Sequence, residues 1–227
     1  MLRHLIDLFF PLVCFGCHRP LLRNEYLICT VCRHELPQTQ YYRNPFNEAF
    51  YKFYGRIPVE HVSCFVYFRK KGIVQQLIHA LKYRGQQEIG RVLGEWYTSD
   101  LQTVEIIDTI DYIIPVPLHP RKLRERGYNQ VYSFGKALSA LLDIPFDDTI
   151  LFKKTYTKTQ SKKRIAKRMQ LIADSFEVRF EQRHHGKHFL LLDDVLTTGT
   201  TLESCGRQLL TIPETKLSII TIAMSRS

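Results

Sequence analysis

The sequence predicts an α/β domain with a mostly parallel central sheet, preceded by a small metal-binding segment. Strand-like and helix-like stretches alternate over residues 62–227, which is typical of a parallel sheet covered by helices. The run Phe189–Leu192 is unbroken and apolar, as expected of a strand buried on both faces. Four cysteines lie within nineteen residues near the N-terminus, and 227 residues suit one ordinary domain with such an addition.

The composition is that of a globular protein with excess positive charge. Hydrophobic residues make up 44% and charged residues 24% of the chain, which argues against wholesale disorder. The net charge of +10 favours polyanionic partners: nucleic acid, phosphorylated metabolites or an anionic membrane face. No apolar run reaches the roughly 18 residues that span a bilayer. Asp7 interrupts the apolar stretch Leu2–Val13, so we expect a short amphipathic helix there, no export signal and a cytoplasmic location.

Residues 1–37 are expected to form a zinc ribbon. Two Cys-x2-Cys pairs, separated by eleven residues, together offer four thiolates, a set that suits a closed tetrahedral Zn²⁺ site. The zinc would be structural, because no coordination position is left for water, and its binding would supply folding energy. A redox role for the pairs and substitution of one ligand by His18 or His34 are the alternatives. The predicted ligands are Cys14, Cys17, Cys29 and Cys32.

Residues 38–61 are expected to form an aromatic connector folded onto the main domain. Seven aromatic residues lie here among prolines, asparagines and a glycine. Clustered aromatic side chains usually pack against the protein, but they also suit stacking on the bases of single-stranded nucleic acid. Both interpretations stay open for this segment.

The elements of the main domain, 62–227, follow from periodicity and turn residues. Ile73, Leu77 and Leu81 recur every four residues before Gly85, which predicts a helix ending at that glycine. Apolar runs bounded by turn residues predict the strands. In chain order we expect a strand at Val62–Phe68, helices over 73–84 and 88–101, a strand at Tyr112–Val116, a helix over 129–142, a strand at Ser175–Phe180, the central strand Phe189–Leu192, a helix over 200–211 and a closing strand at Leu217–Ala223.

The most informative segment joins the central strand to the next helix. The strand leads into Asp193 and Asp194, and a hydroxyl-rich turn opens the helix. Backbone N–H groups, hydroxyls and the helix dipole favour a phosphate monoester in this turn, and the adjacent carboxylates suit sugar hydroxyls. A plain strand–turn–helix cap is the alternative. The turn residues are Thr197, Thr198, Gly199, Thr200 and Thr201.

Four apolar residues, Asp-Asp and then Thr-Thr-Gly-Thr resemble the phosphoribosyl pyrophosphate (PRPP) motif of type I phosphoribosyltransferases. The resemblance implies the fold of that family and Mg²⁺-PRPP as the ligand. It also implies that Asp193 and Asp194 hold the ribose hydroxyls and that the 197–201 turn holds the 5′-phosphate.

In that family a loop after an earlier parallel strand binds the pyrophosphate. By resemblance this loop is Pro115, Val116, Pro117 and Leu118, and the basic residues after it are expected on a loop that folds over the site. Arginines there would neutralise charge on the leaving group, and an ordinary basic surface loop is the alternative. The candidate residues are Arg121, Arg124 and Arg126, with Lys122 beside them.

Further segments narrow the resemblance. Residues 79–85 (His-Ala-Leu-Lys-Tyr-Arg-Gly), residues 114–130 and the cysteine pairs look like the ComF proteins, which are competence-associated and combine this fold with an N-terminal zinc ribbon. That family usually carries Arg-x-x-Asn before a later strand. Here Leu171 stands where the asparagine after Arg168 is expected.

A basic tract carries eight cations in sixteen residues and no acid. It would contact a polyanion, either pyrophosphate as a lid or single-stranded DNA as a groove lining, or it would form a solvated face. Its cations are Lys153, Lys154, Lys158, Lys162, Lys163, Arg164, Lys167 and Arg168.

Two functions of different class are consistent with these features. One is an enzyme that transfers the phosphoribosyl group of PRPP to a nitrogen acceptor and releases pyrophosphate. The other is a catalytically silent module, regulated by PRPP or a nucleotide, that binds single-stranded DNA. The resemblance to ComF proteins implies a role in DNA uptake during natural transformation, together with other DNA-uptake proteins. The sequence identifies neither a general base nor the acceptor.

Overall fold

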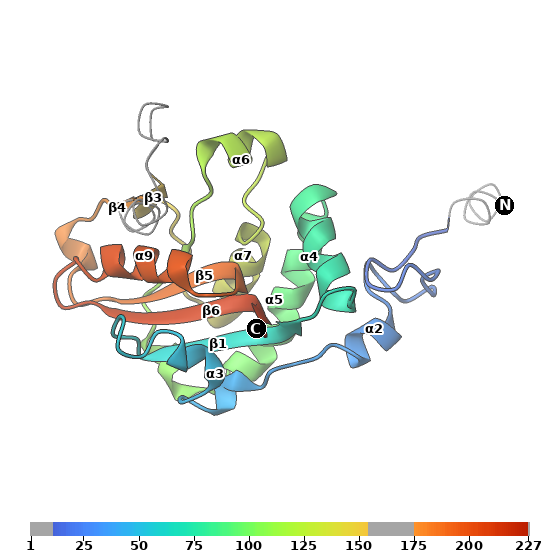
Figure 1. The fold of residues 1–227 in the computed structure, drawn as a ribbon, viewed down its shortest axis with the longest axis horizontal. Coiled ribbons are helices and arrows are strands. Elements are labelled where there is room, and N and C mark those ends of the chain that lie inside the picture. Colours follow the sequence, from blue (N-terminus) through green and yellow to red (C-terminus); the bar gives the residue numbers. More distant parts are fainter. Residues whose placement is uncertain (1–10, 154–174, 227) are drawn as a thin grey trace.

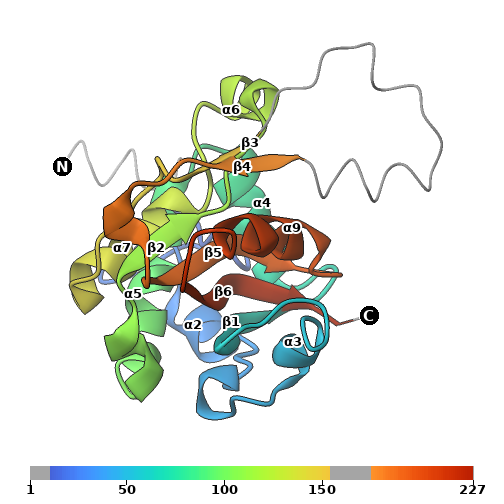
Figure 2. The ribbon, with the colours of Figure 1, turned by 90° about the vertical axis from the view of Figure 1, so that its left-hand side faces the viewer.

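The computed structural model describes residues 11–153 and 175–226, and a four-stranded parallel sheet forms its centre. The strands lie in the order β1-β6-β5-β2. They are β1 (His61–Phe68), β2 (Tyr112–Pro115), β5 (His188–Leu196) and β6 (Lys216–Ser225). Helices cover both faces of the sheet (Figures 1 and 2), which confirms the predicted α/β class with a parallel sheet.

The side chains of β5 alternate between two hydrophobic cores. Leu190 and Leu192 face the core that contains α4 (Ile73–Tyr83), α5 (Gln87–Leu101) and α7 (Tyr132–Leu142). Phe189 and Leu191 face the second core, with α3 (Glu48–Tyr51) and α9 (Thr200–Leu209). All four side chains are fully buried, as predicted for a central strand.

Most predicted elements are present, with shifted ends. The helix expected over 129–142 begins at Tyr132, and the last strand, expected to close the sheet, lies inside it between β1 and β5. The central strand does not end before the acid pair. It runs on to Leu196, because β6 continues the ladder through the pairs Asp193–Thr221 and Val195–Ala223.

A helix, α6 (Pro120–Arg126), replaces the basic loop that the sequence was expected to form, so that prediction is wrong. Pro120 occupies the first turn, and the ring nitrogen Nδ1 of His119 accepts the backbone N–H of Arg121. Gly127, at φ +81°, ends the helix in the left-handed region. These are ordinary helix-end features, but the short charged stretch lacks the apolar periodicity by which helices are recognised.

A two-stranded antiparallel ribbon, β3 (Leu151–Lys153) and β4 (Phe176–Val178), packs against α9. β4 confirms the strand expected near residues 175–180. The described residues also include three short 3₁₀ segments: η1 (Tyr41–Arg43), η2 (Glu105–Thr109) and η4 (Gln182–His184).

The N-terminal part runs along the edge of the sheet. After α2 (Thr30–His34), the chain follows β1, where the backbone N–H of Thr39 donates to the carbonyl of Phe65 at 3.0 Å. Further on, the amide of Asn47 donates to the carbonyl of Val62 at 2.7 Å. The helix expected over 2–13 lies largely outside the described residues. None of the helices within the described ranges has the length and apolar character that crossing a bilayer requires.

Candidate functional site

The acid pair lies where β5 approaches the carboxyl edge of the sheet. Because neighbouring residues of a strand point to opposite faces, the two carboxylates have different surroundings. Asp194 points to the side of α4 and α7, and Asp193 to the side of α9. The pair therefore spans the sheet at the start of the turn that follows.

The carboxylate of Asp194 is buried and paired. Its oxygen Oδ2 lies 2.8 Å from the ammonium of Lys82 on α4 and accepts the amide of Gln130 at 2.6 Å. The carbonyl oxygen of Gln130 accepts from the guanidinium of Arg126, which extends the network to α6. Lys82 and Gln130 were not assigned from the sequence, because nothing near them in the chain points to Asp194.

Asp193 is half-buried and accepts the backbone N–H of Asp194 at 2.8 Å. Burial and, next, the negative charge of Asp194 raise the pKa of Asp193 to about 7, against the opposing effect of Lys82 and Lys153. A bound cation or hydroxyl donors would therefore stabilise the ionised form of this carboxyl.

Lys153 is the described end of the basic tract, on β3 beside Asp193. Burial lowers the pKa of its ammonium, which lies 4.9 Å from the ring centroid of Phe176. The other seven cations of the tract fall within residues 154–174, outside the described residues.

The five predicted turn residues come together around a small cavity of about 40 Å³, which Asp193 also lines. Gly199 has φ +80° and directly precedes α9. The hydroxyls of Thr198 and Thr200 lie 3.0 Å apart. Hydroxyls and the N-terminus of a ten-residue helix thus meet at one point, which suits an anion.

Two residues of the connector, 38–61, contact this turn. The buried ring of Phe53 leaves only 3.1 Å to the position that a Cβ on Gly199 would take. The guanidinium of Arg56 donates to the carbonyl of Thr198 at 3.2 Å and forms an ion pair with Glu203 of α9. These contacts could not be predicted from the sequence, because residues 53–56 and 198–203 meet only in the folded chain.

The loop expected to bind pyrophosphate lies beside the acid pair. The backbone N–H of Val116 donates to the carbonyl of Leu192 at 2.8 Å, and the amide of Asn129 donates to the carbonyl of Val116 at 2.9 Å. The stretch that begins at Pro115 is therefore fixed next to Leu192, directly before the acid pair. The structure brings this loop and the acid pair together.

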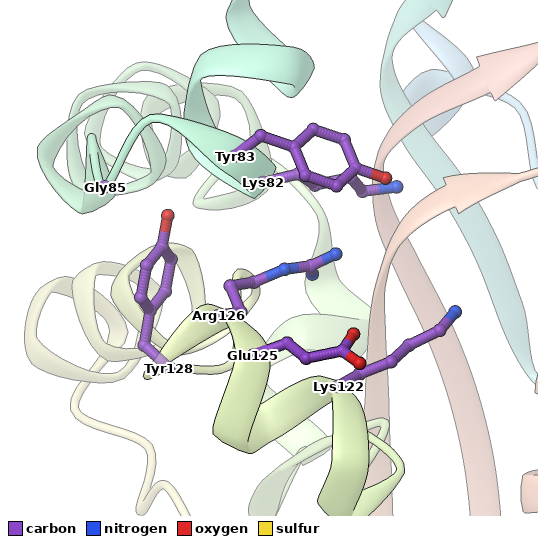
Figure 3. Close-up of a pocket in the computed structure, with 7 residues that line it drawn as sticks. All are labelled: Lys82, Tyr83, Gly85, Lys122, Glu125, Arg126 and Tyr128. Atoms are coloured by element: carbon purple, nitrogen blue, oxygen red, sulfur yellow. The ribbon is translucent and has the colours of Figure 1, made fainter.

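A cavity of about 320 Å³ lies between the last turn of α4 and α6, and we call it the cation-lined cavity because three cations line it beside a single carboxylate, that of Glu125. Figure 3 shows the side chains of Lys82, Lys122 and Arg126 extending in the same direction from these two helices. Of the predicted basic residues, Arg126 lines the cavity. Arg121 does not, and it forms an ion pair with Glu125 at 2.8 Å. Arg124 is likewise not among the lining residues.

The four N-terminal cysteines form one cluster, with all ligand atoms within 4.8 Å of one another. The sulfurs of Cys17 and Cys29 are 3.7 Å apart, close to the roughly 3.8 Å edge of a tetrahedron with Zn–S bonds of about 2.3 Å. Burial opposes ionisation of Cys14, but N–H donors from Cys29, Cys17 and Gly16 outweigh it and lower the pKa of Cys14 to about 7. Burial and the neighbouring thiols raise the pKa of Cys32, so all four thiolates need a cation to form together. The donor set fits zinc.

The cysteine cluster packs against the start of α4 and against α5. A Cβ on Gly16 would lie 2.9 Å from both the sulfur of Cys32 and the side chain of Ile73. The guanidinium of Arg33 lies 4.7 Å from the ring centroid of Trp96. The cluster is therefore attached to the same helix that carries Lys82.

The match to a known domain family agrees with this architecture. Residues 131–225 match the phosphoribosyl transferase domain family. The chain is 31% identical to competence protein F of Haemophilus influenzae over 137 residues, which covers 59% of this chain and 60% of that protein. It is 25% identical to the DNA utilization protein YhgH of Salmonella typhimurium over 218 residues, which covers 88% of this chain and 91% of that protein. Among solved structures, the glutamine PRPP amidotransferase of Bacillus subtilis, complexed with ADP and GMP, aligns with a TM-score of 0.41 and 19% identity over 59% of this chain and 26% of that one.

The parallel sheet, its helices and the matched domain define a protein with the type I phosphoribosyltransferase fold. The proteins to which the chain is similar include competence protein F of Haemophilus influenzae and competence protein ComFC of Bacillus subtilis. The chain spans about 60% of the length of the first of these relatives.

The contact between the connector and the turn can be tested by replacing Gly199 with alanine. Residue 199 lies in the left-handed region, which costs a non-glycine residue about 1–2 kcal/mol, and the new Cβ would also press on Phe53. Gly127 is a matched control, because it has φ +81° and nothing within 4 Å of its Cβ position. In urea unfolding, Gly199→Ala should lose about 1 kcal/mol more than Gly127→Ala. Equal losses would show that Phe53 does not constrain the turn.

Proposed function

We propose that this protein binds Mg²⁺-PRPP at the carboxyl edge of its sheet and transfers the phosphoribosyl group to a nitrogen acceptor. One observation carries the proposal. An acid pair and the hydroxyl-rich turn that follows it in the chain adjoin a cation-lined cavity formed by the distant residues 82–85 and 122–128. Their order matches the ribose, the 5′-phosphate and the pyrophosphate of PRPP.

Each part of the ligand has a chemically suited partner. The 5′-phosphate would accept from the hydroxyls and backbone N–H groups of the 197–201 turn, helped by the dipole of α9. The ribose hydroxyls would donate to Asp193 and Asp194. The pyrophosphate would lie along the loop at Val116 and meet the cations of Lys82 and Arg126.

Magnesium would be held mainly by oxygens of PRPP, with the carboxylate of Asp193 beside it, because Mg²⁺ takes few protein ligands when phosphates are present. The bound ion would neutralise charge on the leaving pyrophosphate. The chain's own contribution is to hold the ribose and to stabilise that charge through Lys82, Lys122 and Arg126. A silent module would bind PRPP through the same contacts but release no pyrophosphate.

The biological setting we propose is DNA uptake, together with other DNA-uptake proteins. The names of the relatives, competence protein F and DNA utilization protein, support this setting. Pyrophosphate release measured with PRPP, Mg²⁺ and a panel of bases and amines distinguishes the enzyme from the silent module.

The ribose assignment predicts that Asp193→Asn combined with Asp194→Asn removes PRPP binding. At a ligand concentration of about a hundred times Kd, PRPP with Mg²⁺ should raise the Tm of the unchanged protein by roughly 5–10 °C. The double variant should show no such shift. Asp108→Asn, an exposed acid on η2, is the control and should keep it. An undiminished shift in a correctly folded double variant would refute the assignment.

We also propose that the four-cysteine cluster holds one structural zinc ion. Elemental analysis of the purified protein should give about one zinc per chain, and Cys14→Ser with Cys32→Ser should abolish it and lower the Tm. Cys205→Ala, a buried cysteine outside the cluster, should keep the zinc. Stably folded, metal-free protein would contradict this proposal.

A second candidate function is binding of single-stranded DNA, favoured by an aromatic surface group: Phe46, Phe50, Tyr51 and Tyr54. These rings contact one another with centroids 5.4–6.0 Å apart, and Phe46, Tyr51 and Tyr54 are more than half exposed. Exposed aromatic rings stack on bases of any sequence. Lys52, Arg56 and the basic tract would contact the phosphates.

This candidate predicts that Tyr51→Ala with Tyr54→Ala raises the Kd for a twenty-nucleotide single strand by about tenfold or more, since each stacked base contributes about 1–3 kcal/mol. Tyr26→Ala, equally exposed on the N-terminal segment, is the control. Affinity should fall steeply with salt, and further with charge reversal in the 153–168 tract. Salt-insensitive binding, or an unchanged Kd in the double variant, would argue against this surface.

A further inference from the structure

The guanidinium of Arg56 connects three parts of the chain. It donates to the carbonyl of Lys52 on its own segment at 2.9 Å and to the carbonyl of Thr198 at 3.2 Å, and it forms an ion pair with Glu203 of α9. A guanidinium offers its N–H groups in a rigid, planar fork. The contacts to Lys52 and Glu203 therefore determine how Arg56 meets the turn.

We infer that Arg56 is a positioning residue for the 5′-phosphate: it fixes the peptide between Thr198 and Gly199 with its N–H directed to the bound anion. The identity of the anion rests on the proposed function. The orientation of the peptide rests on the contacts of Arg56 alone.

The orientation follows from the geometry of a peptide unit. No cis peptide bond occurs within the described ranges, so the carbonyl of Thr198 and the N–H of Gly199 point in opposite directions. Arg56 holds that carbonyl on the side of the connector. The N–H of Gly199 therefore points away from the connector, and Thr198 and Gly199 both line the small cavity of the turn.

The N–H groups of this peptide and the preceding one are available to a ligand. Those of Thr198 and Gly199 have no protein acceptor in the part of the chain that the structure describes. Unpaired N–H groups at the start of a helix suit an anion only while they keep their direction. Gly199 alone does not ensure this, because glycine adopts positive and negative φ about equally well. The hydrogen bond from Arg56 opposes rotation of the peptide, which would turn the carbonyl of Thr198 toward the anion.

Arg56 also neutralises an unfavourable charge, and it shares this second effect with Arg207. Glu203 lies in the first turn of α9, where its carboxylate would repel a bound phosphate. Arg56 and Arg207 both pair with Glu203, the latter at 2.8 Å. The other printed partner of Arg207 is the carbonyl of Arg56, at 2.8 Å. Of the two arginines, Arg56 is the one that donates to the turn.

The test compares Arg56→Met with Arg207→Met in the full-length protein. Each change removes one positive charge beside Glu203 and keeps an apolar stem, and both side chains are more than a third exposed. Calorimetry measures the Kd of ribose 5-phosphate, whose phosphate would lie in the turn, and of pyrophosphate, which would lie in the cation-lined cavity. Arg56→Met should raise the Kd of ribose 5-phosphate about tenfold, since hydrogen bonds to a charged group are lost, and Arg207→Met by no more than about twofold. Neither change should alter the Kd of pyrophosphate by more than about twofold.

The amide NMR signal of Gly199 reports on the peptide itself. Ribose 5-phosphate should shift this signal in the unchanged protein and in Arg207→Met, and it should leave the signal in place in Arg56→Met. Arg56→Lys keeps the charge but loses the fork, and it should retain most of the defect even if Arg56→Met does not fold. Equal losses of affinity in Arg56→Met and Arg207→Met, or full affinity in Arg56→Lys, would show that charge alone matters and would overturn the inference.

The thermal shift by Mg²⁺-PRPP, recorded on the same variants, separates this inference from the proposed function. An undiminished PRPP shift in Arg56→Met overturns the role of Arg56 and leaves PRPP binding intact. Binding of ribose 5-phosphate that depends on Arg56, without any PRPP shift in the unchanged protein, supports the role of Arg56 and removes PRPP as the ligand. No binding of ribose 5-phosphate to the unchanged protein at millimolar concentration overturns the inference.

Discussion

The carboxylate of Asp194 is a buried charge that has to be paired, and both its partners come from distant parts of the chain. Lys82 lies in the last turn of α4, and Gln130 precedes α7. An uncompensated buried charge costs several kcal/mol, so the positions of these two elements relative to β5 are tightly constrained. Tyr128 adds to this constraint, because its hydroxyl donates to the carbonyl of Leu81, next to Lys82. The carboxyl edge of the sheet is organised around this one side chain.

The side chain of Lys82, which pairs with Asp194, also lies between two cavities. Lys82 and Tyr83 stand between a cavity lined by cations and a cavity lined by apolar and aromatic side chains. The two cavities therefore share one wall but differ in chemistry.

The N-terminal part of the chain lies outside the matched domain, 131–225, yet it contacts the elements of the site. Phe53 and Arg56 support the turn at Gly199, and the cysteine cluster packs against Ile73 at the start of α4. The N-terminal part, which has no large core of its own, thus supports both the turn at Gly199 and the helix α4 that carries Lys82. We expect its folding and the geometry of the site to be coupled, because a packed interior transmits displacement.

The sequence by itself determined what depends on neighbouring residues: the strands and most helices, the paired cysteines and the turn from Asp193 to Thr201. Their periodicity and spacing follow from local geometry and can be recognised in one segment at a time. Only the tertiary structure decided which segments meet. It placed the last strand inside the sheet, gave Asp194 its partners Lys82 and Gln130, supported the turn with Arg56, and separated two cavities by α4. Contacts between residues tens of positions apart are set by the burial and pairing of the whole chain, and they leave no periodic pattern in any one segment.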